Sequence, residues 1–256
     1  MDILRLEAPI WKNRGKLLHG FLGRRGGKSS GPFSGLNVSL NVGDDPQAVK
    51  DNICDLKRAV GAHDLRIVTM KQVHGDRIVE VEDKSQKEVG EADGMVTKEK
   101  NLFLGILTAD CVPILFCAPE AQLVAVVHAG WRGTLLGLVP KMISHLMNRF
   151  GVESSLIEVV LGPAIGGCCY EIGADVATPV QKKWGALANK ALRTNRGKTF
   201  LDLKALNSSL LQEAGIPPEN ISQVGPCTAC AAEDFFSYRR DGAVTGRQIS
   251  FIGWLF

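Results

Sequence analysis

The chain has 256 residues, of which 45% are hydrophobic and 22% charged, with a net charge of +3, as expected for a globular protein with a sizeable core. The small charge and an aromatic content of 6% argue against a nucleic-acid partner and against an anionic membrane surface. No run approaches the ~18 apolar residues of a transmembrane helix, and charged residues interrupt the amino-terminal segment where a signal peptide needs an apolar core. We therefore expect a soluble, cytoplasmic protein.

The amino-terminal part alternates short apolar segments with glycine-rich or charged turns. Strands are predicted at 16–22, 36–42, 66–73, 77–81 and 92–97. Asp45-Pro46 is typical of a helix start, and apolar residues at helical spacing continue to Gly61, where the helix should end. Around His74 the apolar pattern indicates a sharp break or a hairpin, and 83–91 is predicted to be a loop.

A basic glycine-rich loop follows the first predicted strand. Gly27-Lys28-Ser29 resembles the end of a P-loop, but the required earlier glycine is replaced by Leu22. Gly31-Pro32 also prevents the helix that should follow the motif. We therefore predict an exposed loop that is either only solvated or able to meet an anion through its arginines and backbone N–H groups.

The rest of the chain begins with two apolar runs of strand length, within Leu107–Thr134. A helix is predicted over 135–150, with Pro140 bending it or marking its first turn, and a strand at 157–161. Helices at about 174–184 and 202–214, the second capped by Asp202, precede a turn and a closing strand. The sequence contains no repeat and no linker, so we predict one domain over residues 1–256.

The chain has seven cysteines, an odd number for a disulfide framework. Cys227 and Cys230 form a C-x-x-C pair, and Cys168-Cys169 would be the other half of a four-cysteine zinc site. An adjacent pair is a poor second zinc knuckle, however, because the usual pattern has two C-x-x-C pairs. A thioredoxin-like role does not fit either, since the C-x-x-C does not open a helix after a first strand. Buried thiols are the favoured interpretation.

His74, Cys111 and His128 each lie at the end or edge of an apolar strand. If those strands are neighbours, two imidazoles and a thiolate converge. That set suits zinc and leaves a fourth position for water or substrate, as in catalytic zinc sites, although copper also binds such ligands. Without a metal, the same residues would form a cysteine nucleophile with a histidine base. Three unrelated core residues are the remaining alternative.

Three segments resemble the signature motifs of one known family. They are Lys71-Gln72-Val73-His74-Gly75, Thr108-Ala109-Asp110-Cys111-Val112-Pro113 and Val127-His128-Ala129-Gly130-Trp131-Arg132-Gly133. The family is the YfiH-like family, also described as multicopper polyphenol oxidases, as laccase-domain proteins and as purine nucleoside phosphorylases. The similarity also extends over 40–46, 162–171, 236–241 and 245–247, so that it covers nearly the whole chain.

The resemblance implies an α+β fold, a single-domain layered sandwich with mixed β-sheets flanked by helices, similar to the toxin deamidase fold. It implies a zinc ion held by His74, Cys111 and His128. It also implies phosphorolysis of adenosine, inosine and methylthioadenosine, with adenosine deamination as a second activity. The small-molecule partners would be a purine nucleoside and phosphate. Copper-dependent phenol oxidation is a secondary expectation, because three ligands are too few for the copper centres of a laccase.

Residue roles follow from position. Cys111 and its neighbour Asp110 are the predicted catalytic residues, Asp110 either moving a proton at the purine or orienting a ligand histidine. Arg24 and Lys71 are candidate phosphate donors and Asn41 a candidate ribose or phosphate contact, although such residues are usually only solvated. The alternative functions are a hydrolase that edits a UDP-muramyl cell-wall precursor and a non-catalytic protein in which the metal holds the fold.

Overall fold

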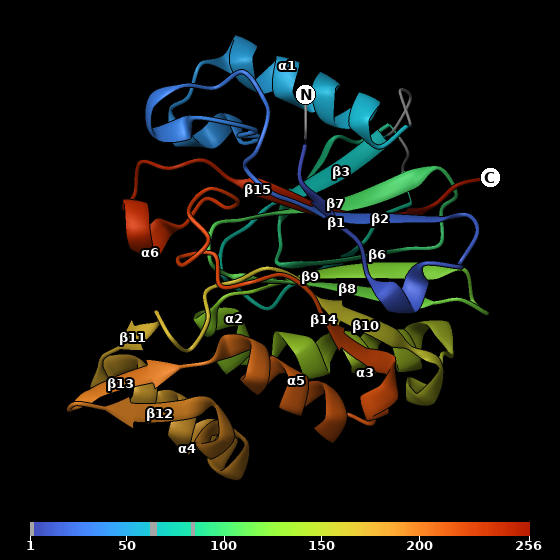
Figure 1. Cartoon of the computed structure of the whole chain (residues 1–256). Helices are drawn as coiled ribbons and strands as arrows, with labels where there is room; N and C mark the ends of the chain where they lie inside the picture. The colour runs from blue at the N-terminus through green and yellow to red at the C-terminus, as the bar shows by residue number, and fades with distance from the viewer. Residues whose placement is uncertain (1–2, 62–65, 83–84) are drawn as a thin grey trace.

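Two mixed β-sheets lie face to face at the centre of the structure, a computed structural model that describes residues 3–61, 66–82 and 85–256 (Figure 1). Within these residues each sheet has six strands. In spatial order the first sheet contains β1 (Arg5–Leu6), β2 (Leu17–Leu22), β15 (Gln248–Trp254), β7 (Leu102–Thr108), β3 (Arg66–Lys71) and β5 (Glu88–Glu91). The second contains β14 (Ile221–Gln223), β10 (Glu158–Leu161), β8 (Val112–Ala118), β9 (Leu123–Ala129), β6 (Gly94–Thr97) and β4 (Ile78–Glu80).

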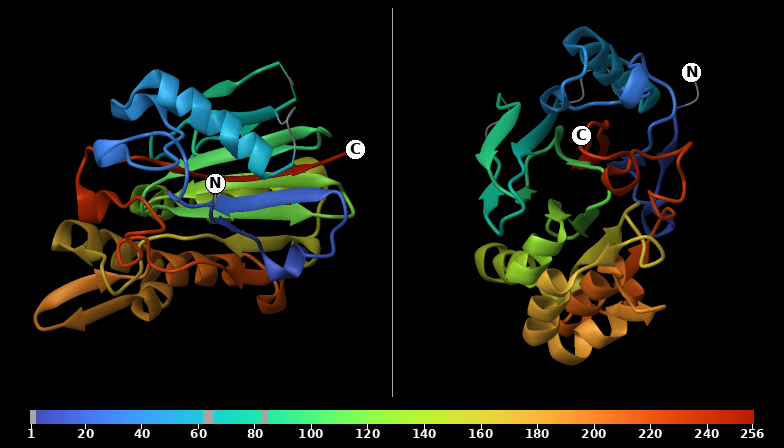
Figure 2. Two further views of the ribbon diagram at one scale, coloured as in Figure 1. Left: turned by 45° about the horizontal axis from the view of Figure 1, so that its top comes forward. Right: turned by 90° about the vertical axis from the view of Figure 1, so that its left-hand side faces the viewer.

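Helices cover the outer face of each sheet. Helix α1 (Pro46–Ala59) packs on the first sheet through its apolar side, which includes Leu56. The second sheet is covered by α2 (Trp131–Leu136), α3 (Leu138–Phe150), α4 (Ala174–Ala191) and α5 (Leu203–Glu213). A small sheet of β11 (Glu171–Ile172), β13 (Lys198–Leu201) and β12 (Leu192–Asn195) lies beside α4, and the short α6 spans Tyr238–Asp241. Figure 2 shows the resulting order of helix, sheet, sheet and helices.

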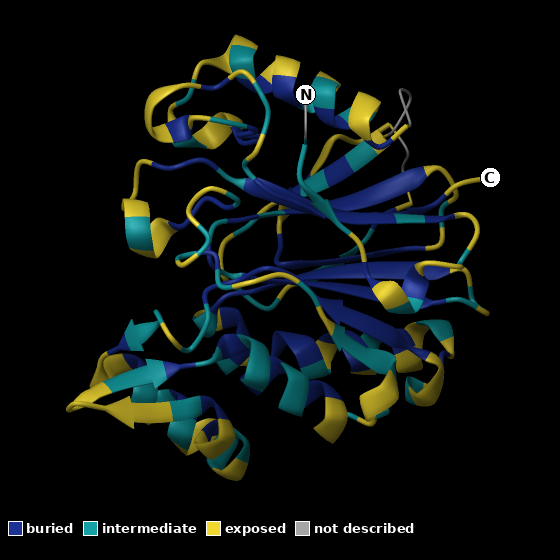
Figure 3. Ribbon diagram, in the orientation of Figure 1, coloured by how far each residue is buried: buried dark blue, intermediate teal, exposed yellow. Residues whose placement is uncertain are grey.

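The central strands β8 and β9 are buried along their whole length (Figure 3). Because side chains alternate along a strand, one set faces the helices and the other faces the opposite sheet. In β8, Ile114 and Phe116 pack in the cluster that contains the helices, whereas Leu115 packs in the cluster between the sheets. By the same alternation, position 111 and position 128 of β9 belong to the side that faces the first sheet.

The expected fold class is confirmed, since mixed sheets are flanked by helices. Several local signals also hold. The Asp45 and Asp202 side chains accept hydrogen bonds from the N–H groups of Gln47 and Ala205 and so cap α1 and α5. Pro140 lies in the first turn of α3, which is separated from α2 by Gly137. Among the described residues, no helix combines the length and the apolar character needed to cross a bilayer.

Two local predictions are wrong, and one of the two alternatives at His74 is excluded. Segment 36–42 is not a strand, because the Asn37 and Ser39 side chains accept hydrogen bonds from nearby backbone N–H groups and Leu40–Val42 forms a 3-10 turn. Part of the predicted loop at 83–91 is β5, which pairs with β3 in parallel; residues 83 and 84 lie outside the described part. The break at His74 is not a hairpin, since β3 and β4 belong to different sheets.

His19 lies on β2 and is the buried histidine of the first sheet, with 4% of its surface exposed. Its Nε2 accepts a hydrogen bond from the Ala8 N–H at 2.9 Å, so protonation of that nitrogen would break the bond. Burial, and then the charge of Arg5, lowers the pKa of His19 from 6.5 to about 4. The folded protein therefore holds this imidazole in its neutral form.

The free energy of unfolding should fall as the pH drops from 6.5 to about 4, because the unfolded chain then binds a proton at His19 that the folded chain refuses. Above pH 6.5 this effect is absent; at pH 4 it should reach about 3 kcal/mol. Urea unfolding across this range should show a steeper loss for the wild type than for His19→Gln. Equal slopes for wild type and His19→Gln would contradict the prediction.

Candidate metal centre

Three potential metal ligands meet where the two sheets adjoin. The ligand atoms of His74, Cys111 and His128 all lie within 4.8 Å of one another. His128 is the penultimate residue of β9, and Cys111 immediately precedes β8. The antiparallel register pairs Val112 with Ala129, so Cys111 follows onto the same end of the strand pair as His128. His74 lies in the segment that connects β3 to β4. The structure thus brings together the three residues singled out in the sequence.

The three ligand residues differ in how far they are buried. His128 is buried, Cys111 is half-buried and His74 is exposed. The Cys111 Sγ and His74 Nε2 atoms are 3.8 Å apart, and the two imidazole rings meet edge to face with centroids 4.8 Å apart. A metal held by these donors would be anchored from the protein interior and reached from the His74 side. This is the arrangement that leaves a coordination position for water or substrate.

Asp93, which the sequence analysis did not single out, holds two of the three ligands in place. It is fully buried and lies opposite His128 across the β6–β9 pair. One carboxylate oxygen, Oδ1, is 2.8 Å from His128 Nδ1 and accepts the His74 N–H at 3.0 Å. The other oxygen accepts the N–H groups of Gly75 at 2.6 Å and Val73 at 3.2 Å. A bond to Nδ1 leaves His128 Nε2 for a metal, as second partners of ligand histidines commonly do.

The same carboxylate explains the backbone at His74. This residue has φ +59°, in the left-handed region that side chains other than glycine rarely adopt. Three successive N–H groups, from Val73 to Gly75, converge on Asp93 and over-determine that conformation. The break between β3 and β4 is therefore a stabilised turn that places the His74 imidazole beside the ends of β8 and β9.

The three donors also tune one another electrostatically. Burial would raise the pKa of the Cys111 thiol, but the charge and hydrogen bond of His128, together with His74, lower that pKa from 9.0 to about 6. The thiolate and Asp93 in turn raise the pKa of His128 against the effect of burial. Hydrogen bonds from His128 and from backbone N–H groups lower the pKa of Asp93 although burial opposes this. The cluster thus favours the thiolate, which is the form of cysteine that binds metals and attacks substrates.

The donor set suits a single soft or borderline metal ion. Two imidazole nitrogens and one thiolate are ligands for zinc and copper, and their mutual closeness allows one ion to reach all three.

Gly130 leaves space for two of these ligands, His74 and Cys111. A Cβ atom at this glycine would come 2.9 Å from His74 Cδ2 and 3.0 Å from Cys111 Sγ. The absent side chain therefore lets both ligands close on the same point.

Asp110 lies beside Cys111, and each of its carboxylate oxygens accepts a hydrogen bond from a residue other than the ligand histidines. Its Oδ1 accepts the Thr228 hydroxyl at 2.6 Å, and its Oδ2 accepts the Arg239 N–H at 2.6 Å. Asp110 has φ +97° and is 8% exposed. The residue that orients a ligand is Asp93, whereas Asp110 ties the Cys111 turn to the segment that leads into α6.

The predicted substrate-binding residues are Arg24, Lys71 and Asn41, and the first two have partners outside the ligand set. The Arg24 guanidinium donates to the Ser34 and Ala232 carbonyls and stacks over Phe236. Lys71 is exposed and pairs with Glu91 at 2.8 Å. Asn41 is exposed in the 3-10 turn. In the part of the chain that the structure describes, none of the hydrogen bonds of these three residues leads to the three ligand residues.

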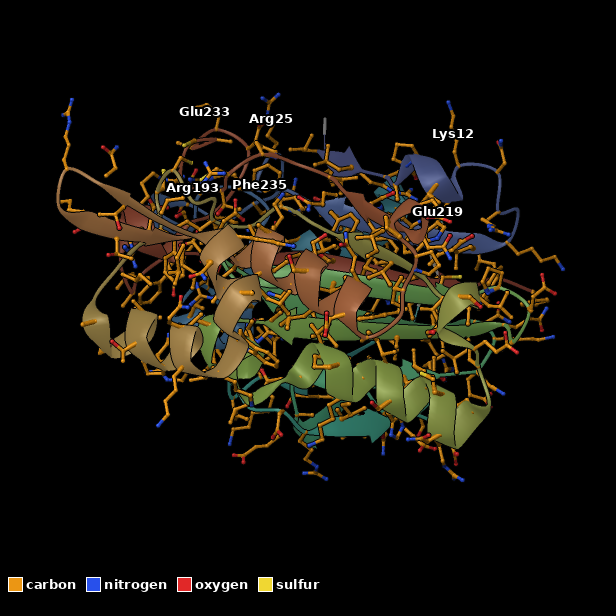
Figure 4. The ribbon with its side chains drawn as sticks, turned by 90° about the horizontal axis from the view of Figure 1, so that it is seen from below. Lys12, Arg25, Arg193, Glu219, Glu233 and Phe235 are labelled. Carbon is orange, nitrogen blue, oxygen red and sulfur yellow. The ribbon has the colours of Figure 1, made fainter. Side chains whose placement is uncertain are left out.

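Arg24 lines a cavity of about 550 Å³ formed by the glycine-rich loop and the segment before α6. Arg25 and Glu233, both labelled in Figure 4, also line it, as do Arg240 and Asp241. Arg25 forms an ion pair with Asp234. The basic loop is therefore folded against the protein and its cations have partners, which differs from the freely solvated alternative.

The charge of Cys111 affects the pKa of two further residues. Burial lowers the pKa of Arg247, and the negative charges of Cys111 and Asp110 oppose that effect. Burial raises the pKa of Tyr170 to about 12, with the Cys111 charge contributing. Both residues thus lie within electrostatic range of Cys111. They belong to the further similar segments 162–171 and 245–247, but their position along the chain gave no sign that they lie near Cys111.

Comparison with protein families places the chain. Residues 18–255 match the family model described as multi-copper polyphenol oxidoreductase laccase. The chain belongs to this family. Purine nucleoside phosphorylase YlmD of Geobacillus stearothermophilus is 38% identical over 267 residues, which cover 98% of this chain and 97% of that protein. Purine nucleoside phosphorylase of Deinococcus radiodurans is 37% identical over 235 residues, covering 92% and 88%.

Solved structures of this laccase-like family share the fold. YlmD from Geobacillus stearothermophilus superposes with a TM-score of 0.92 at 37% identity, covering 100% of this chain and 97% of that one. YfiH from Bacillus licheniformis gives a TM-score of 0.90 at 36% identity, covering 95% and 94%. The family predicted from the three motifs is therefore confirmed, and His74, Cys111 and His128 form a possible metal-binding site within it.

Proposed function

We propose that this chain is a zinc-dependent purine nucleoside phosphorylase with adenosine deaminase as a second activity. It would convert adenosine, inosine and methylthioadenosine to the free base and ribose 1-phosphate or its methylthio analogue. The observation that carries the proposal is the cluster of His74, Cys111 and His128, open on its His74 side, in a chain whose relatives bear the name purine nucleoside phosphorylase. A zinc ion bound there would supply a Lewis acid and, for deamination, an acidified water.

The chain offers candidate residues for the other requirements of the reaction. In phosphorolysis a phosphate oxygen forms a bond to C1′ of the ribose, the C1′–N bond breaks, and the departing base takes up a proton. The attacking phosphate, entering as dihydrogen phosphate, gives up this proton. We assign to Asp110, which Thr228 and Arg239 hold in one orientation, the role of accepting the proton from the phosphate and passing it to the base. Each carboxylate oxygen keeps a further lone pair after accepting one hydrogen bond, so Asp110 still has capacity to meet a substrate.

Phosphate needs cationic or N–H donors. Arg24, Lys71 and Asn41 remain our proposed contacts, although Arg24 and Lys71 would have to exchange their present partners, the Ser34 and Ala232 carbonyls and the Glu91 carboxylate. Arg247 is a further candidate, because it lies within electrostatic range of Cys111 and Asp110. A cation in that position would attract phosphate toward the reacting centre.

Two other reactions compete for the same site. A hydrolase that edits a UDP-muramyl precursor would use the same metal and would be recognised by turnover of that precursor in place of inosine. Copper-dependent oxidation of phenols matches the family name, but the three clustered ligands are fewer than a laccase requires for its several copper ions. A metal used only to hold the fold would leave no turnover of either substrate.

Zinc-replete protein incubated with inosine and phosphate should release hypoxanthine and ribose 1-phosphate. Cys111→Ala should abolish this release, because it removes a proposed zinc ligand. Asp110→Asn should keep the zinc and lower kcat by about 10²–10⁴-fold, the usual contribution of a proton-transferring side chain. Product can be followed by chromatography and zinc content by elemental analysis.

The exposed Cys54, in α1, supplies a matched control for the loss of a thiol. Cys54→Ser should retain wild-type turnover. Full activity in Cys111→Ala would contradict the proposed function. Turnover of a UDP-muramyl precursor by a wild-type protein inactive on inosine would replace it by the hydrolase.

A further inference from the structure

A second group of metal-type ligands lies outside the candidate metal centre. The thiols of Cys168, Cys169, Cys227 and Cys230 all lie within 4.8 Å of one another. Cys230 Sγ is 3.3 Å from Cys169 Sγ and 3.7 Å from Cys168 Sγ. We refer to these residues as the four-cysteine cluster. Residues about 60 positions apart are thus brought to one point by the fold.

The interpretation of these residues as buried thiols is wrong. Cys168 and Cys230 are exposed, and Cys169 and Cys227 are half-buried. Cysteines kept only for packing are normally among the most buried residues, as Cys117 is in β8. Four thiols gathered where water reaches them gain little from apolar burial, so packing does not explain the cluster.

We propose that the four-cysteine cluster is a structural zinc site. In a tetrahedral site with Zn–S bonds of about 2.3 Å, neighbouring sulfurs lie about 3.8 Å apart. The observed sulfur separations of 3.3 Å and 3.7 Å, and the limit of 4.8 Å for the whole set, match one ion among four thiolates. An iron–sulfur cluster spreads its cysteines around several iron atoms and needs a wider cage.

The backbone shows how an adjacent cysteine pair serves as half of such a site. Gly166 accepts the N–H of Cys169 and of Tyr170 at its carbonyl, each at 3.0 Å, and so closes a tight turn around the pair. The Gly166 N–H donates to Cys227 Sγ at 3.2 Å, which is the type of bond that stabilises a thiolate. A Cβ atom on Gly166 would approach Cys168 Sγ to 3.2 Å and Cys227 Cβ to 3.3 Å. A side chain at this position would crowd the thiols.

The segment that contains Cys227 and Cys230 also forms a tight turn. Ala231 N–H donates to the Cys227 carbonyl at 3.0 Å, so Cys227–Ala231 is a single turn that presents two thiols. Thr228 N–H donates to the Ala164 carbonyl at 3.1 Å, which fixes this turn against the segment that leads to Cys168. The Lys204 ammonium donates to the Gly225 carbonyl at 3.1 Å and adds a positive charge beside the thiolates.

The cluster would lock together the two segments that hold Asp110. Thr228, inside the C-x-x-C turn, donates its hydroxyl to Asp110, and Ile165 N–H donates to the Asp110 carbonyl at 2.9 Å. A zinc ion among the four thiols would cross-link these segments. It is therefore a structural ion with all four positions filled, in contrast to the three-donor centre.

Metal content and thiol accessibility test the proposal. Reduced, zinc-loaded wild type should hold one zinc more per chain than Cys230→Ser, and Cys54→Ser should hold as much as wild type. Cys111→Ala should retain the zinc of the four-cysteine cluster, so the result is independent of the proposed function. In wild type, the four clustered thiols should resist maleimide until a chelator is added, as read by peptide mass spectrometry, while Cys54 reacts throughout.

Equal zinc content in wild type and Cys230→Ser would overturn the proposal. So would clustered thiols that react with maleimide in the zinc-loaded protein as fast as Cys54. Disulfide bonds among the four residues, seen as a loss of two mass units per bond and reversed only by a reductant, would also overturn it. If Cys230→Ser does not fold, cobalt substitution of the wild type should still show intense thiolate-to-cobalt absorption that persists in Cys111→Ala.

Discussion

Asp93→Asn should weaken zinc binding at the His74–Cys111–His128 centre by about 10–100-fold, the usual cost of losing the partner of a ligand histidine. The carboxylate accepts from His128 Nδ1 and from three backbone N–H groups around His74. An asparagine of nearly the same shape offers one acceptor oxygen and turns an NH₂ group toward donors. His128 would lose its orientation and the His74 turn would lose the anion that fixes its positive φ.

The same substitution should lower the free energy of unfolding of the metal-free protein by about 2–4 kcal/mol, because buried hydrogen bonds to a charged group are lost and donors are left unsatisfied. Zinc affinity is best measured by competition with a chromophoric chelator in a Cys230→Ser background, so that the four-cysteine cluster does not contribute. Stability is measured by urea unfolding.

Asp76→Asn is the matched control, since Asp76 lies two residues after His74 and forms an ion pair with Lys141 near solvent. It should change the stability by no more than about 0.5 kcal/mol and leave zinc affinity unaltered. Wild-type zinc affinity in Asp93→Asn would show that the ligands are positioned without this carboxylate.

The sequence predicted those features that depend on short-range patterns. Helix caps at Asp45 and Asp202, the apolar strands and the family could all be recognised, because each leaves a signal within a few residues. The three metal-type ligands could be predicted because each stands at the end of an apolar run and within a segment that resembles a family motif. Their convergence depends on strand pairing, which the apolar pattern alone did not specify.

The residues that were missed act through long-range contacts. Asp93 is one acidic residue before a short strand, and nothing nearby in sequence shows that it faces both ligand histidines. The signal that was available is a charged residue inside Ala92-Asp93-Gly94 at the start of an apolar strand, since a buried carboxylate needs partners. The spacing of Cys168, Cys169, Cys227 and Cys230 does not predict their cluster, because the Gly166 turn that makes an adjacent pair suitable is a tertiary feature.

Gly130→Ala should abolish inosine phosphorolysis although it adds only one methyl group. Gly130 has φ −74° and ψ 171°, an extended conformation that alanine adopts freely, so no backbone strain is introduced. The added Cβ would lie 2.9 Å from His74 Cδ2 and 3.0 Å from Cys111 Sγ. Both distances are shorter than a van der Waals contact. Both ligands must move apart, and a metal site tolerates only small errors in donor position.

We expect zinc affinity at this centre to fall on the order of 100-fold in Gly130→Ala, with loss of inosine phosphorolysis. The free energy of unfolding should fall by only about 1 kcal/mol, because alanine is a poorer helix cap than glycine at the start of α2. Gly90→Ala in β5 is the matched control, since a Cβ there has no neighbour within 4 Å. If both variants bound zinc equally, the ligands would not need the close approach seen at Gly130; a selective loss in Gly130→Ala would tie metal binding to the geometry of these donors.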